Sequence, residues 1–155
     1  MATTGLVAGF MVSHALVLGR FLDWLVTSGP GVPFASTYPA FAGTAGRSGL
    51  ALFYGLCGMQ VVAALAFLVV AVGARRERVA AAIAGVAAVL WPAVHYGSGF
   101  GAVEQAVLRS LGEVSGGLAA RFVAWNVPIH VVHAAILTAG LGALLSVPMS
   151  AIKRS

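Results

Sequence analysis

The sequence predicts an all-α integral membrane protein, a bundle of four transmembrane helices with a short interfacial amphipathic helix between the third and the fourth. Two observations predict it. Of the 155 residues, 60% are apolar and only 8% are charged, whereas a soluble domain has about a quarter charged residues. The chain also contains four apolar stretches of about 20 residues, the length of helix that crosses a hydrocarbon layer of about 30 Å.

We expect the four spans at Gly5 to Thr27, Leu50 to Gly73, Val79 to Gly97 and Phe122 to Val147. Together they form a single domain. The first span is interpreted as a retained helix because it has no basic segment before it and its apolar run is longer than that of a signal peptide. From Ala102 to Val114 the apolar residues recur at helical spacing, which predicts the short interfacial helix.

The basic residues predict the orientation of the helices. Arg75, Arg76 and Arg78 lie in the turn between the second and third spans, and Lys153 and Arg154 end the sequence. Because basic residues accumulate in cytoplasmic loops, we expect both termini in the cytoplasm. The net charge of +5 is thus a topology signal. No basic stripe with interleaved aromatic residues accompanies it, so we expect a lipid bilayer and no nucleic acid as partner.

The polar and aromatic residues gather in the outer half of the predicted bundle, away from the termini. The inner half is almost wholly Ala, Val, Leu and Gly. An aromatic belt alone would appear at both interfaces, so the one-sided distribution predicts a pocket that opens outward. The residues expected at this pocket are Arg20, Asp23, His95, Tyr96, Glu104, Trp125, Asn126, His130 and His133.

The spacing of these residues indicates how they would act. Asn126, His130 and His133 follow an i, i+4, i+7 pattern, which places them on one stripe of the fourth helix, facing the bundle interior. Arg20 and Asp23 are near enough in sequence to neutralise each other as an anchor for the helix end. Alternatively, Arg20 holds an oxygen atom of a ligand while Asp23 orients it.

We expect the ligand to be an apolar molecule with an oxygen, such as a quinone, a phenol or a lipid. In a redox or isomerase-type reaction, His130, His95 and Asp23 would be the catalytic groups that donate or accept protons. The ligand-binding residues would be Arg20, Tyr96, Glu104, Trp125, Asn126 and His133.

Two cofactor alternatives remain open. His14 and His133 are expected at similar depth on the first and fourth helices, so they could be the axial ligands of a b-type haem. His130 and His133 with Glu104 or Asp23 could instead bind a transition metal. Hydrogen bonds that only join helices would also account for the buried polar residues.

The main rival from another functional class is a non-catalytic subunit of a larger membrane complex, or a homo-oligomer. Small residues such as Gly5 and Gly9 would let another helix approach closely. Separately, Gly97, Gly99 and Gly101 predict a flexible joint before the interfacial helix, which would act as a lid over the pocket.

Overall fold

The computed structural model describes residues 1–27, 46–71, 75–110 and 114–147, with side chains from residue 51 onward in the second of these ranges. All regular structure in these ranges is helical. The elements are α1 (Ala2–Ser13), the π-helical turn η1 (His14–Leu18), α2 (Gly19–Thr27), α4 (Gly46–Val70), α5 (Arg75–Gly97), α6 (Phe100–Leu108) and α7 (Gly116–Leu145).

Four helical stretches are long and apolar enough to cross a membrane, and they confirm the predicted fold class. They are Ala2–Thr27, which combines α1, η1 and α2, then Ala51–Val70, Arg75–Gly97 and Gly116–Leu145. The chain is therefore a four-span helical membrane protein. The last helix begins at Gly116, before the predicted Phe122. Gly116 and Gly117, which would be expected to interrupt a helix, are its first two residues.

The short helix between the third and fourth spans is also present. It begins at Phe100, two residues before the predicted Ala102, and its regular part ends at Leu108. The end predicted at Val114 follows residues 111–113, which lie outside the described part of the chain. Its buried residues pack on α2 and α7 in a cluster of Leu25, Phe100, Val103, Val107, Phe122 and Ile129.

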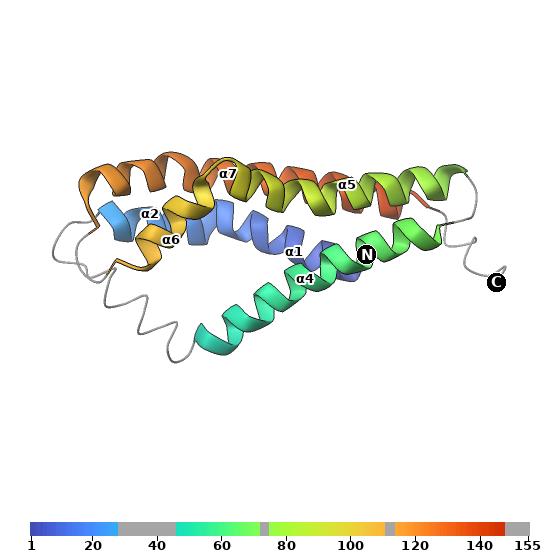
Figure 1. The fold of residues 1–155 in the computed structure, drawn as a ribbon, viewed down its shortest axis with the longest axis horizontal. Helices are drawn as coiled ribbons and strands as arrows, with labels where there is room; N and C mark the ends of the chain where they lie inside the picture. Colours follow the sequence, from blue (N-terminus) through green and yellow to red (C-terminus); the bar gives the residue numbers. More distant parts are fainter. Residues whose placement is uncertain (28–45, 72–74, 111–113, 148–155) are drawn as a thin grey trace.

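Successive spans run in alternating directions, as Figure 1 shows. Helices α5 and α7 lie side by side with the most extensive contact, and α1 packs on α7. The end of helix α4 lies close to the start of α5, and α4 crosses obliquely so that its own beginning lies farther from α1 (Figure 1). We call the end of the bundle that contains α2, α6 and the start of α7 the α6 end.

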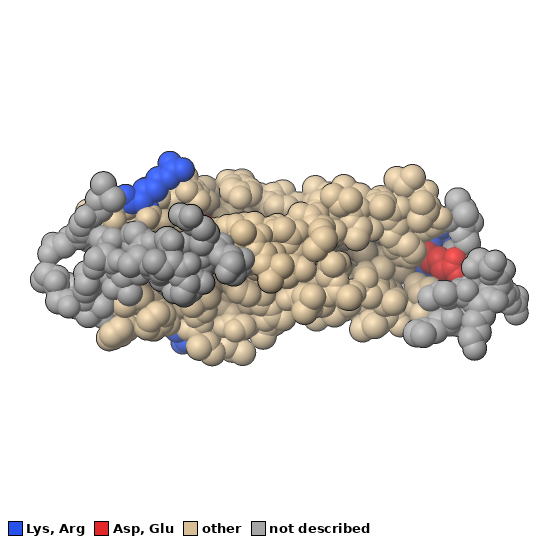
Figure 2. All heavy atoms as spheres, turned by 90° about the horizontal axis from the view of Figure 1, so that it is seen from below, with Lys and Arg blue, Asp and Glu red and all other residues tan. Residues whose placement is uncertain are grey.

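Charged residues lie at the two ends of the face shown in Figure 2, and the long middle of that face has none. This distribution suits a helical bundle surrounded by lipid. The start of α1, the end of α7 and the start of α5 at Arg75 lie together, opposite the α6 end (Figure 1). The cytoplasmic orientation of this end stays a prediction. Two of the basic residues on which it depends, Lys153 and Arg154, lie outside the described residues.

Glycines bring helices together at some of the positions that the sequence suggests. A Cβ added at Gly140 of α7 would lie 2.9 Å from the Cβ of Ala87 on α5, and one at Gly85 would lie 3.2 Å from Leu68 on α4. A Cβ at Gly5 would contact Leu141 at 3.8 Å, whereas Gly9 has nothing within 4 Å. Close packing therefore depends on α5 against α4 and α7, and only Gly5 of the predicted pair contributes within the chain.

The first span contains a π-helical turn that the sequence pattern does not reveal. Insertions of this kind are rare and occur often at functional sites. A Cβ added at Gly19 would lie 2.8 Å from the carbonyl oxygen of His14 and 2.9 Å from its ring carbon Cδ2. The absence of a side chain at Gly19 thus leaves the space that the His14 ring and backbone occupy.

Gly140 and Gly142 offer a matched test of the α5–α7 contact. Gly140→Ala should lower Tm in detergent because the new methyl group overpacks against Ala87, at a cost of about 1–3 kcal/mol. Gly142→Ala should leave Tm unchanged or raise it, because its added Cβ has nothing within 4 Å and alanine favours a helix over glycine by about 1 kcal/mol. Equal Tm changes in the two variants would contradict this packing.

Candidate functional site

A cavity of about 690 Å³ lies among α1, α4, α5, α6 and α7. Most of its wall is aromatic or aliphatic. Its polar side chains include three histidines of α5 and α7, one histidine of the π turn and two side chains of α6, and the hydroxyl groups of two tyrosines and the indole of Trp91 add to them. The lining residues are Phe10, Met11, His14, Leu18, Leu22, Phe53, Tyr54, Cys57, Gly58, Val61, Trp91, Pro92, His95, Tyr96, Gly101, Glu104, Gln105, Leu108, Phe122, His130 and His133.

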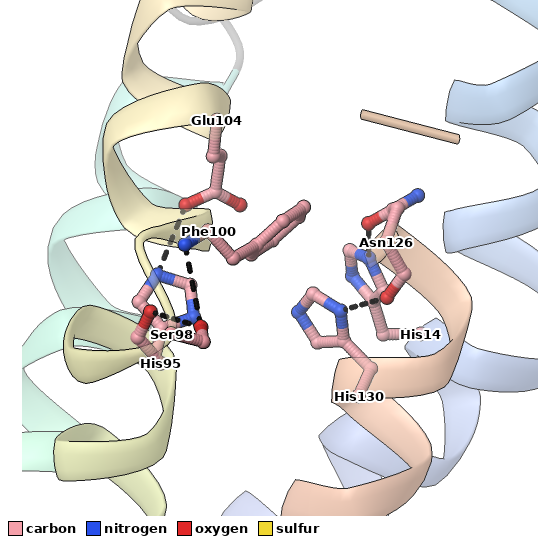
Figure 3. Close-up of polar contacts among 7 residues, drawn as sticks. All are labelled: His14, His95, Ser98, Phe100, Glu104, Asn126 and His130. Carbon is pink, nitrogen blue, oxygen red and sulfur yellow. Dashed lines mark hydrogen bonds and ion pairs between the residues drawn. The ribbon is translucent and has the colours of Figure 1, made fainter. Parts of the chain in front are cut away.

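One polar wall is built where α5 turns into α6. Gly99 has a φ of +80°, a conformation that glycine adopts without strain, and this turn brings α6 back over the end of α5. The Nε2 atom of His95 then lies 3.4 Å from Oε2 of Glu104 (Figure 3). A Cβ at Gly101 would lie 2.9 Å from the ring of Tyr96, so this glycine allows close packing, and the predicted flexibility of the joint stays a prediction.

The opposite wall comes from the polar stripe of α7, where His130 lines the cavity and Asn126 lies behind it. Asn126, His130 and His133 are all buried, which confirms that the i, i+4, i+7 stripe faces the bundle interior. The Nδ1–H group of His130 donates a hydrogen bond of 2.7 Å to the backbone oxygen of Asn126. The ring of His130 also stacks on the ring of His14, with centroids 3.6 Å apart and planes 19° from parallel.

The side chain of Asn126 joins α7 to the first span through three hydrogen bonds. Its Nδ2 donates to the backbone oxygen of Gly19 at 2.9 Å and to Oδ1 of Asp23 at 2.8 Å. Its Oδ1 is then the acceptor for Nε2–H of His14 at 3.1 Å (Figure 3). Because both partners of Nδ2 can accept, this network assigns the orientation of the amide and makes Nε2 of His14 the protonated nitrogen.

His133 lies between the two walls. Its ring centroid is 5.5 Å from that of His95, 5.5 Å from that of His130 and 5.6 Å from that of Trp91. The residue is fully buried. Neither ring nitrogen has a hydrogen-bond partner in the part of the chain that the structure describes.

The predicted site residues separate into three groups. His95, Tyr96, Glu104, His130 and His133 line the cavity. Asn126 and Asp23 lie behind it, where the hydrogen bond between them joins α7 to α2. Arg20 is exposed and Trp125 is 52% exposed, and neither is among the lining residues.

The arrangement of these residues does not match either of the two cofactor alternatives. An axial haem ligand directs a ring nitrogen at the iron, whereas Nε2 of His14 is hydrogen-bonded to Asn126 and its ring face is covered by His130. His14 and His133 as they lie therefore do not fit a bis-histidine haem. Within the described ranges, no group of three or more His, Cys, Asp or Glu residues is arranged to hold a metal ion.

Sequence reasoning missed several residues of the cavity. The rings of Phe10 and Phe53 are in contact, with centroids 4.0 Å apart, and they close one side of the cavity. Trp91 lines it, and its indole Nε1–H donates to Oε1 of Gln60 at 3.2 Å, a hydrogen bond that links α5 to α4. Gly58 also lines the cavity. A glycine inside a transmembrane helix was the one signal in the sequence that could have pointed to this part of the wall.

Asn126→Leu should lower the free energy of unfolding by about 3 kcal/mol, because the buried polar groups of His14, Gly19 and Asp23 would lose their partner. Titration with a denaturing detergent, followed by circular dichroism, measures the change. Trp125→Leu, one residue away on the exposed side, should cost less than about 1 kcal/mol. If the two variants were equally stable, the Asn126 network would not stabilise the bundle.

Comparisons with protein-family models, with curated proteins and with solved structures found no match for this chain. The function has to be inferred from the cavity and from the side chains that surround it.

Proposed function

We propose that this membrane protein binds an apolar small molecule with an oxygen function in the cavity among α1, α4, α5, α6 and α7. The volume of about 690 Å³ falls within the range of about 300–1,000 Å³ that is common for small-molecule sites. The wall is also of the usual kind, with aromatic and aliphatic surfaces and a few converging polar groups. A ring compound of the quinone or phenol class matches both the size and the polarity.

The observation that carries the proposal is the state of His133. This imidazole is fully buried, and both of its ring nitrogens lack a partner within the described residues. An unsatisfied buried polar group costs about 1–3 kcal/mol. A ligand oxygen that displaces the side chains covering the His133 ring would remove this cost, since a neutral imidazole can donate to a carbonyl oxygen or accept from a hydroxyl group.

The position of α4 supports entry from the bilayer. This helix supplies Phe53, Tyr54, Gly58 and Val61 to the cavity wall, and it diverges from α1 toward the α6 end (Figure 1). Gly58 presents no side chain, and a Cβ added there would have nothing within 4 Å. A lipid-soluble ligand could therefore reach the histidines from the membrane past α4.

An acid–base step on such a ligand would use the histidines that line the cavity. His130 and His95 contribute ring nitrogens to opposite walls, as Figure 3 shows for their side chains. Asp23 is connected to the cavity only through Asn126 and His14, so its role would be to position these groups. Arg20 and Trp125 would contact lipid rather than the ligand, given their exposure.

Trp91 gives a direct test because it lines the cavity, whereas the other two tryptophans of the chain, Trp24 and Trp125, are 56% and 52% exposed. In a Trp24→Phe, Trp125→Phe background, duroquinone should quench the Trp91 fluorescence of the protein in mild detergent. We expect a saturable curve, because a binding site fills whereas quenching by a quinone dissolved in the micelle rises without limit. The affinity is measured by fitting the quenching to a binding curve against the concentration of quinone in the micelles.

Two glycines on α4 supply the matched control. Gly58→Phe should abolish the saturable component because its ring fills the cavity, and Gly55→Phe on the same helix should keep it because Gly55 is not a lining residue. His133→Leu should weaken binding. Loss of saturable quenching in both glycine variants, or its persistence in Gly58→Phe, would place the quinone elsewhere.

A further inference from the structure

The hydrogen bonds behind the cavity determine which nitrogen of His130 faces it. The backbone oxygen of Asn126 can only accept, so the Nδ1 atom at 2.7 Å from it must be the protonated one. In a neutral imidazole the other nitrogen, Nε2, then has a lone pair and no proton. Figure 3 shows this nitrogen directed away from α7 toward the wall formed by His95 and Glu104. Among the described residues it has no hydrogen-bond partner, so α7 presents a hydrogen-bond acceptor to the cavity.

The wall opposite presents a second acceptor. One carboxylate oxygen of Glu104 is near His95, at 3.4 Å from its Nε2. The other carboxylate oxygen points to the side where His14 and His130 lie (Figure 3). Glu104 is a lining residue, so this second oxygen is available to a hydroxyl group of a molecule in the cavity.

The remaining polar groups around the cavity offer few donors. The indole Nε1–H of Trp91 is used by Gln60, and Nε2–H of His14 is used by Asn126. Tyr54 and Tyr96 are 59% and 72% exposed and Gln105 is also exposed, at the rim. His133 alone adapts, because either nitrogen can hold its proton. The deep part of the cavity thus has fixed acceptors on opposite walls, Glu104 and Nε2 of His130 among them, and one adaptable group, His133.

We infer that the cavity selects ring compounds that have hydroxyl groups, phenols and hydroquinones, over quinones and ethers of the same shape. This inference rests on the proposed function and names the ligand class of the same site. A phenol or hydroquinone hydroxyl donates to Glu104 or to Nε2 of His130, and a hydroquinone can satisfy both walls. A quinone or an ether only accepts, so it leaves both fixed acceptors without a partner and binds through His133 alone.

The test compares two ligands that differ in one group. In the variant that retains only Trp91, with duroquinone as the bound quencher, 4-octylphenol and 4-octylanisole are added as competitors and fluorescence recovery is measured. Concentrations in the micelle are corrected for the measured partitioning of each compound. The phenol should displace the quinone at a concentration at least about tenfold lower than the anisole, since a hydrogen bond to a charged group contributes about 1.5–3 kcal/mol and 1.4 kcal/mol is a factor of ten.

Glu104→Gln identifies the acceptor. An amide oxygen is a weaker acceptor than a carboxylate, so the preference for the phenol should fall by about threefold or more. Glu77→Gln is the matched control, because Glu77 lies in the first turn of α5, at the end of the bundle opposite the α6 end (Figure 1), and the preference should stay unchanged.

Each remaining outcome has a definite meaning. Equal displacement by the two compounds, or better displacement by the anisole, overturns the selectivity and leaves the proposed function in place. An unchanged preference in Glu104→Gln overturns the role of that carboxylate. Absence of saturable quenching by duroquinone in the Trp91 variant, together with no saturable change in Trp91 fluorescence on adding 4-octylphenol, overturns both the proposed function and the ligand class. The comparison of the two ligands requires no variant at the site, so a folding defect in Glu104→Gln does not prevent it.

Discussion

The side-chain amide of Asn126 determines where the polar groups of this bundle lie. In the hydrocarbon layer no water can satisfy a buried polar group, so each needs a partner inside the protein. The fully buried Asn126 supplies partners to His14, Gly19 and Asp23 at once. These residues belong to η1 and α2, which makes one amide of α7 the polar link between the first and the last span.

The geometry of the first span follows from this link. The π turn from His14 to Leu18 and the missing side chain at Gly19 place the His14 ring beside the amide and against His130. The stacked rings and the hydrogen bond from His130 to the Asn126 backbone then hold the imidazole of His130 in one orientation. The chemical character of the cavity wall is therefore a consequence of packing between helices that lie behind it.

The sequence predicted the spans, the short helix and the inward stripe of α7 because these depend on composition and on helical periodicity, which neighbouring residues determine. It did not predict the pairing of His14 with His130. Counting residues along a regular helix places His14 level with His133, but the π turn interrupts the regular rise after His14. The outward directions of Arg20 and Trp125 were missed for a related reason, since depth along a helix says nothing about the rotation that tertiary packing gives it.

The cavity is a consequence of how α4 and α6 are held, rather than a gap that better packing would close. Helix α4 is fixed to α5 by the close approach of Leu68 to Gly85 and by the hydrogen bond from Trp91 to Gln60, both on the side of the cavity away from α6. Helix α6 is fixed to α2 and α7 by the cluster around Phe100 and Phe122. Since the two helices are anchored to different neighbours, neither can move toward the other to fill the cavity without losing its own contacts. The unpartnered imidazole therefore persists in the folded protein, and the proposed ligand would give it a partner while these packed interfaces stay intact.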